Sequence, residues 1–178
     1  LSLTLRLCDT PQTRQWWNHT FQLELTLNFT AEICELRLIA HGNYSTTAAL
    51  HSYLATSDIR ATRIHGVGTQ GYDTVAGKPR QNLPSPLSLN GEFGTICSYA
   101  EPQTVLVTPD RTLTLTHVNN SNVVVWNPWQ QRAAQTSDIP DDGWQHFVCL
   151  ETAAIDRPLV STPQHPASLG VQFALSHH

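Results

Sequence analysis

Glu151 and His51 are the two residues whose types and surroundings are best suited to chemistry. Glu151 directly follows the apolar run Phe-Val-Cys-Leu at 147–150, which is typical of a buried strand. Carboxylates are seldom buried unless they are paired, so Glu151 either borders a pocket or meets a cation. His51 lies in the apolar segment 48–53, and an imidazole titrates near neutral pH, as a general acid or base must. Taken alone, this segment also fits a core histidine bonded to a backbone carbonyl.

The sequence Trp126-Asn127-Pro128-Trp129 places two indoles around a proline turn. Indole faces can stack on the C–H faces of a sugar ring, so these residues could form a carbohydrate platform. The alternative is that they form a packing corner with no ligand.

Metal and cofactor sites are not indicated. Asp138, Asp141 and Asp142 lack the spacing of a calcium loop, and a turn with capping aspartates is the better interpretation. No Cys-x-x-Cys pair, phosphate-binding glycine loop or Gly-x-Ser-x-Gly sequence is present. The four cysteines lie far apart, and we expect free, mostly buried thiols, as in a reducing compartment.

The elements that must position these residues are strands, because apolar and polar residues alternate along most of the chain. Such alternation predicts half-buried antiparallel strands with one face on a core. The predicted strands cover residues 1–7, 21–29, 36–40, 105–107, 112–116, 123–126, 147–150 and 171–175. Asn90-Gly91 predicts a hairpin turn, 158–166 a loop, and 129–136 the single candidate helix.

This pattern predicts an all-β fold, an antiparallel β-sandwich in which residues 1–178 form a single domain. The net charge of −4 provides no basic face for nucleic acid, and no apolar run is long enough for a membrane helix. Residue 1 is a leucine inside an alternating run, so we expect a processed product or the later part of a longer chain.

Five segments together resemble the D-hexose-6-phosphate mutarotases, the glucose-6-phosphate 1-epimerases of the aldose 1-epimerase superfamily. They are Thr-Thr-Ala-Ala-Leu-His-Ser-Tyr-Leu at 46–54, Ser-Asp-Ile at 57–59, Val-Val-Trp-Asn-Pro at 124–128, Ser-Asp-Ile-Pro-Asp-Asp-Gly at 137–143 and Val-Cys-Leu-Glu-Thr at 148–152. The resemblance implies a galactose mutarotase-like supersandwich, incomplete here at its N-terminal side, and a cytoplasmic enzyme without cofactor that acts on hexose 6-phosphates.

The resemblance also implies roles for individual residues. The catalytic pair of the family falls on His51 and Glu151. Trp126, Asn127 and Trp129 are the expected substrate-binding residues, together with Glu92.

The chain departs from the family pattern in two places. An earlier part of the family, with another active-site histidine and the phosphate-binding arginines, has no counterpart in this sequence. The family's Asp-Arg pair is also absent from the matching stretch 91–99, where Glu92 is the nearest carboxylate. Two functions therefore stay open, an isomerase acting on hexose 6-phosphates and a non-catalytic carbohydrate-binding protein of the same fold.

Overall fold

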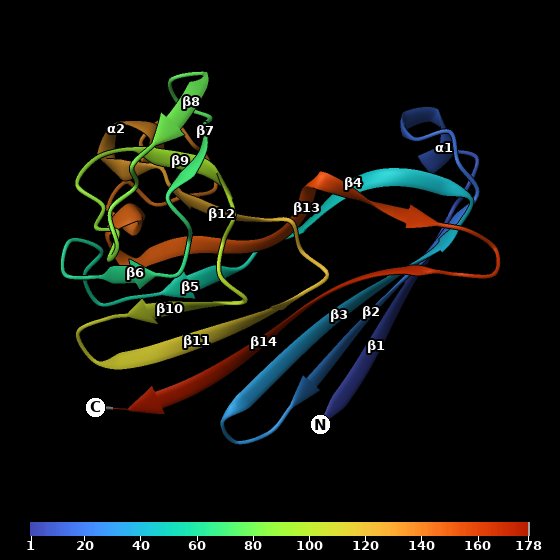
Figure 1. The fold of residues 1–178 in the computed structure, drawn as a ribbon, viewed down its shortest axis with the longest axis horizontal. Coiled ribbons are helices and arrows are strands. Elements are labelled where there is room, and N and C mark those ends of the chain that lie inside the picture. Colours follow the sequence, from blue (N-terminus) through green and yellow to red (C-terminus); the bar gives the residue numbers. More distant parts are fainter. Residues whose placement is uncertain (178) are drawn as a thin grey trace.

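The computed structural model describes residues 1–177 as two antiparallel sheets packed face to face (Figure 1). The first sheet contains, in spatial order, β1 (Ser2–Cys8), β2 (Phe21–Phe29), β3 (Ile33–Gly42), β14 (Ala167–His177), β11 (Arg111–Val118), β10 (Gln103–Val107) and β6 (Arg63–His65). The second contains β4 (Tyr44–Leu50), β13 (Phe147–Ser161), β12 (Asn122–Asn127), β9 (Phe93–Ser98), β7 (Gln70–Asp73) and β8 (Lys78–Gln81), with β5 (Tyr53–Ala55) also paired to β13. The predicted all-β sandwich is confirmed.

Helical structure in the described chain is confined to three short elements. They are α1 (Thr13–Trp16), α2 (Trp129–Ala133) and the 3₁₀ helix η1 (Gly143–His146). The predicted helix at 129–136 is present but ends three residues early.

The core lies between the two sheets because alternate residues of each strand point inward. Val125 of β12 and Leu150 of β13 meet Leu115 of β11 and Leu169 of β14, and all four are fully buried. His117 of β11 spans the same interior, with Nδ1 2.8 Å from Thr152 Oγ1 and Nε2 3.0 Å from a threonine hydroxyl of β10. Burial lowers the pKa of His117 to about 4.

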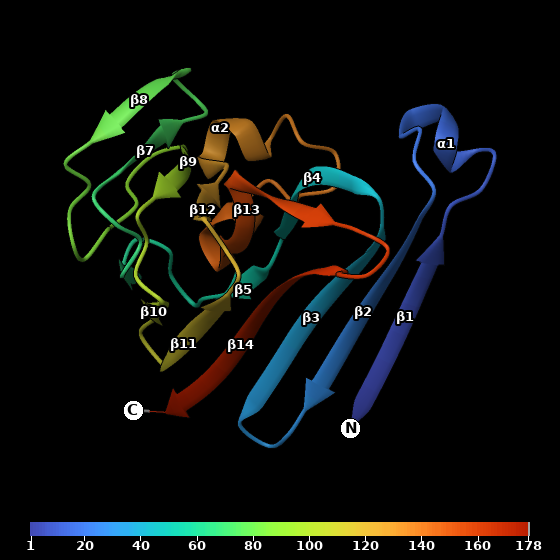
Figure 2. The same ribbon diagram turned by 45° about the vertical axis from the view of Figure 1, so that its right-hand side comes forward.

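Strand β1, at the edge of the first sheet, has no covering layer, whereas Leu23 and Leu25 of its neighbour β2 pack partly against the core. Figures 1 and 2 show β1 and β2 extending beyond the second sheet, whose edge strand is β4. We predicted that one face of the 1–7 strand rests on a core, and this was wrong: Leu3, Leu5 and Leu7 are each about half exposed. They pair with Leu27, Leu25 and Leu23 of β2. We call the side of β1 and β2 formed by these six residues the leucine face.

Two turn predictions were also wrong. Asn90-Gly91 joins no hairpin, because β9 pairs with β7 and β12, and the segment before the turn carries Pro84 and Pro86, which have no N–H to donate. The predicted loop at 158–166 begins later, because β13 continues to Ser161 beyond an irregularity between Ala154 and Leu159.

The cysteine prediction agrees with the structure. All four thiols are free; Cys97 and Cys149 are buried, Cys34 is half-buried and Cys8 is exposed. Within the described residues, no helix has both the length and the apolar character needed to cross a membrane.

Candidate functional site

The structure brings His51 and Glu151 into contact although one hundred positions separate them in the sequence. His51 lies in the short break between β4 and β5, both of which pair with β13. Glu151 lies on β13 at the point where these two strands meet. The distance from His51 Nε2 to Glu151 Oε1 is 3.4 Å, with the histidine side chain 48% exposed and the carboxylate 8% exposed.

Burial dominates the electrostatics of this pair. It raises the pKa of Glu151, and the neighbouring His51 acts in the opposite direction and only partly offsets the rise. The carboxylate is therefore a stronger base than an exposed glutamate, while the imidazole beside it is open to solvent. This combination suits the transfer of protons to and from a ligand that arrives from the solvent side.

Aromatic rings surround the pair. Tyr53 stacks on the imidazole of His51, with ring centroids 5.0 Å apart and planes at 18°. Trp126 presents its edge to both rings at 6.4 Å, and Phe147 lies against Tyr53 and Trp126. Our sequence reasoning selected Trp126 but not Tyr53. The signal for Tyr53 was its position two residues after His51, the period of an extended chain.

The register of the second sheet places these residues on its outer face. Val123 and Val125 of β12 point into the core, so Val124 and Trp126 point away from it. Trp126 pairs with Cys149 of β13, and Val124 pairs with Glu151. The pair and Trp126 therefore share one open side of the sheet.

The other predicted site residues lie elsewhere. Trp129 packs on Trp144 with centroids 4.4 Å apart, and the guanidinium of Arg60 lies 4.8 Å from the Trp144 ring. Asn127 is fully buried, donates to the carbonyls of Trp144 and Phe147, and accepts from the Trp129 amide. These contacts pack Asn127 and Trp129 against Trp144. Glu92 is exposed, with no hydrogen bond or ion pair to another described residue.

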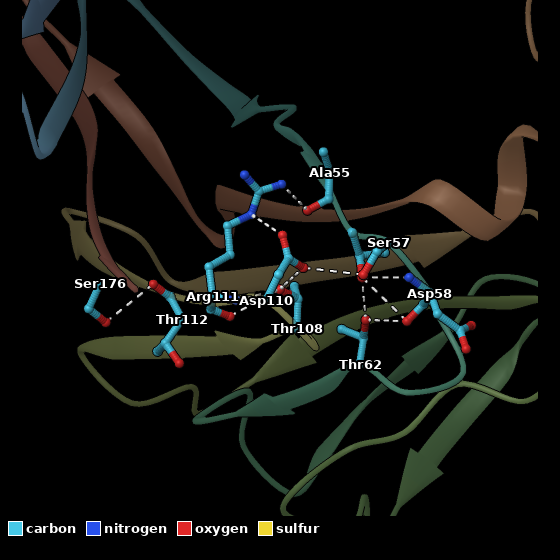
Figure 3. Close-up of polar contacts among 10 residues, drawn as sticks. Ala55, Ser57, Asp58, Thr62, Thr108, Asp110, Arg111, Thr112 and Ser176 are labelled. Carbon is cyan, nitrogen blue, oxygen red and sulfur yellow. Dashed lines mark hydrogen bonds and ion pairs between the residues drawn. The ribbon is translucent and has the colours of Figure 1, made fainter. Parts of the chain in front are cut away.

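A polar network holds the chain that follows β5 (Figure 3). Asp110, in the turn between β10 and β11, accepts hydrogen bonds from Ser57 and Thr108, and these bonds, chiefly that of Thr108, lower its pKa. Arg111 donates to the carbonyl of Ala55 at 3.2 Å. Together they tie the segment carrying Tyr53 to the first sheet. Among the described residues, no group of three or more histidine, cysteine or acidic side chains is arranged to hold a metal ion.

Comparisons with known proteins identify the family of the chain. The model of the family described as "Aldose 1-epimerase" matches residues 1–173. The chain is 34% identical over 171 residues to a Salmonella typhimurium protein named "Putative glucose-6-phosphate 1-epimerase", and 32% identical over 173 residues to an Escherichia coli protein of the same name. These alignments cover 94% and 95% of this chain and 58% of each relative, so the chain spans little more than half of their length.

Solved structures give the same result. A crystal structure of a "putative mutarotase" from Salmonella typhimurium superposes with a TM-score of 0.95 at 30% identity, covering 99% of this chain and 61% of that one. The crystal structure of HI1317 superposes with a TM-score of 0.79 at 28% identity, covering 98% and 61%.

Proposed function

Because this chain belongs to the aldose 1-epimerase family, we propose that it interconverts the α and β anomers of hexose 6-phosphates. The observation that carries the proposal is the contact between His51 and Glu151 on the open side of the second sheet. The names of the relatives, which are glucose-6-phosphate 1-epimerases by description, support the choice of substrate.

Interconversion needs two proton transfers at neighbouring oxygens. The anomeric hydroxyl loses a proton while the ring oxygen gains one, the bond from C1 to the ring oxygen breaks, and rotation followed by closure gives either anomer. Glu151 takes the first proton, because burial makes its carboxylate more basic. His51 in its imidazolium form supplies the second. Both oxygens are attached to C1, so two groups 3.4 Å apart can each reach one of them.

The surrounding rings give the sugar an apolar wall. Tyr53 fixes the plane of the imidazole by stacking on it, and Trp126 borders the same surface. An aromatic wall beside an acid–base pair orients the ring and displaces water from one side of it.

A non-catalytic carbohydrate-binding protein is the second candidate. It is favoured by β9, which has no Asp-Arg pair beside Trp126: Gly94 stands opposite Trp126, and the following Thr95 is fully buried. A protein of this kind would keep the aromatic wall and bind sugar without turnover.

Glu151→Gln in the full-length protein tests the proposal. The change keeps the size of the side chain but removes the base, so anomer exchange is expected to fall by about 10²-fold or more while sugar binding survives. His51→Asn is expected to do the same, and the double variant to be little worse than either, because the two groups act as a unit. The rate is followed by a coupled assay for β-glucose 6-phosphate.

Glu101→Gln is the matched control, because Glu101 is an exposed carboxylate away from the pair. Near-normal exchange in Glu151→Gln would disprove the mechanism. Sugar binding without any exchange in the unmodified protein would establish the second candidate instead.

A further inference from the structure

The pair Asn90-Gly91, which joins no hairpin, lies in the exposed segment that leads into β9. Leu89 before the pair is buried and Phe93 after it is buried, so the segment is anchored on both sides. The side chain of Asn90 itself is exposed. Neither Asn90 nor Gly91 makes a hydrogen bond, through backbone or side chain, to another described residue.

The backbone at Gly91 is open to attack and to rotation. A Cβ placed on this glycine would have no heavy atom within 4 Å, apart from those of its chain neighbours. Its N–H is unbonded, so no hydrogen bond has to break before the nitrogen can react. A segment held by so few interactions opens at little cost in free energy. The nitrogen of Gly91 can therefore reach Cγ of the preceding asparagine.

The other asparagines of the described chain lack this combination of an open side chain and an open following amide. Five of them hold their side-chain amides in hydrogen bonds: Asn28, Asn119, Asn120, Asn122 and Asn127. Two precede a residue whose amide is already bonded to a carbonyl: Asn18 and Asn82. Asn43 precedes Tyr44, whose bulky side chain is buried. The fold thus leaves Asn90 as the reactive position.

We propose that Asn90 is a modification site, at which the asparagine converts without an enzyme to aspartate and isoaspartate. The Gly91 nitrogen attacks Cγ of Asn90, and a new C–N bond closes a five-membered succinimide. The side-chain nitrogen leaves as ammonia with the proton that Gly91 loses. Water then opens one of the two C–N bonds of the ring. Opening at Cγ gives aspartate, and opening at the main-chain carbonyl gives isoaspartate.

Both products change the segment in a measurable way. Each places a carboxylate two residues before Glu92 and makes the chain more negative by one charge at neutral pH. Isoaspartate also lengthens the backbone by one carbon, shortly before Phe93 begins β9. Neither step uses His51 or Glu151, so the inference stands apart from the proposed function.

Hydroxylamine tests the inference, because it opens a succinimide and cleaves the chain there. The folded protein should give the fragments 1–90 and 91–178. Without hydroxylamine, peptide mapping should show the exchange of NH for O at Asn90. We expect the rate in the folded protein to be within about tenfold of the rate in urea, since the segment opens at little cost.

Three variants accompany the unmodified protein. Asn90→Gln should abolish both the cleavage and the mass change, because glutamine would have to close a six-membered ring. Gly91→Ala should slow both severalfold, because a methyl group hinders the nitrogen, and it should not disturb the fold, because the space beside Gly91 is open. Asn43→Gln changes another exposed asparagine and should leave the reaction as it is.

The outcomes that would overturn the inference are distinct. One is protection of the folded protein by about 10²-fold or more relative to urea, which would mean that the fold closes the site. Another is earlier reaction at a different asparagine. Isoaspartate is measured separately, with an isoaspartyl methyltransferase and labelled S-adenosylmethionine. We expect label on the peptide that contains position 90, and a product that is aspartate alone would contradict the isoaspartate branch.

Discussion

At Glu151 the burial that suits the proposed proton abstraction also acts against folding. The pKa of the carboxyl is raised in the folded state, so the folded protein binds a proton more readily than the unfolded chain. The free energy of unfolding, as far as Glu151 affects it, is therefore highest below the ordinary glutamate pKa and decreases as the pH rises above that value. We expect Glu151→Gln to melt at a higher temperature than the unmodified protein at pH 7, with the difference shrinking toward pH 4.

Thermal unfolding of both proteins across this pH range is the measurement. Glu101→Gln, which changes an exposed carboxylate, should show no such difference. A lower melting temperature for Glu151→Gln at pH 7 would contradict the expected cost of burial.

His117 has the opposite dependence on pH. Its pKa is lowered by burial to about 4, against 6.5 for an ordinary histidine, so protonation favours the unfolded chain. Stability is full above pH 6.5 and is lost as the pH falls toward 4, by up to about 3 kcal/mol. Urea unfolding at pH 7 and pH 4.5 measures this loss.

A glutamine at position 117 does not titrate, so the variant should lose less stability between these two pH values than the unmodified protein. His165→Gln, at an exposed position, should retain the full loss. Equal losses in His117→Gln and the unmodified protein would show that other groups cause the dependence.

The sequence indicated individual site residues better than it indicated their grouping. The position of Glu151 after an apolar run pointed to a special carboxylate, but the run does not reveal what lies opposite it in the sheet. The segment around His51 also fits a core histidine, and only the resemblance to a family pointed to a catalytic role. The contact between His51 and Glu151 depends on β4 and β5 both pairing with β13, which the segment does not reveal. Trp126 and Trp129 look equivalent in the sequence, and the turn at Pro128 directs one toward the pair and the other toward Trp144.

Among the elements, β13 is the one on which the site depends, because it carries Glu151 and pairs with the two strands that flank His51. Asn122 of β12 holds the irregular part of this strand. Its Oδ1 accepts hydrogen bonds from the amides of Ile155 and Asp156, and its Nδ2 donates to Asp156. The side chain is fully buried, so these bonds have no water to replace them.

Asn122→Ala is expected to lower the free energy of unfolding by about 2–3 kcal/mol, because the Asp156 amide loses its acceptor and the Asp156 carboxylate loses a donor, while the Ile155 amide keeps Ser121 Oγ. Chemical denaturation measures the change. Asn120→Ala is the control, since Asn120 is half-buried and its side chain donates one long hydrogen bond of 3.4 Å, and the change should cost under about 1 kcal/mol. Similar losses in the two variants would remove the special role of Asn122.

The alternation of apolar and polar residues predicted most strands, because it reflects which face of a strand is buried. The prediction failed where the burial of a face does not follow the alternation. The segment Asp156-Arg157-Pro158 has turn composition, yet β13 continues through it because Asn122, 34 residues earlier, binds its backbone. The leucines of β1 alternate as they would above a core, but the second sheet ends before reaching them. Both features depend on residues far away in the sequence, so the pattern within either segment cannot predict them.

For the whole molecule, the leucine face is a surface that favours association between copies of the chain in solution. It combines exposed leucines with an edge strand whose backbone donors and acceptors have no partner strand on one side. We expect the 178-residue chain to self-associate through this face. Sedimentation velocity should show oligomers for the unmodified chain and monomers for Leu3→Lys combined with Leu5→Lys.

Thr4→Lys is the matched control, because Thr4 lies on the same strand and points to the opposite face. It should leave the association unchanged. A monodisperse unmodified chain would show that exposure of these leucines has no consequence at the concentrations used.

The distribution of the four thiols makes the chain suited to single-site labelling. Burial raises the pKa of Cys97 to about 12, raises that of Cys149 still further, and also raises that of Cys34, so these sulfurs are slow to form the reactive thiolate. Cys8 is exposed at the end of β1. A maleimide dye at neutral pH should therefore attach at this one position without any cysteine being replaced. The dye would sit at the end of β1, on the face opposite its leucines, where energy transfer between labelled copies reports on the approach of one β1 to another.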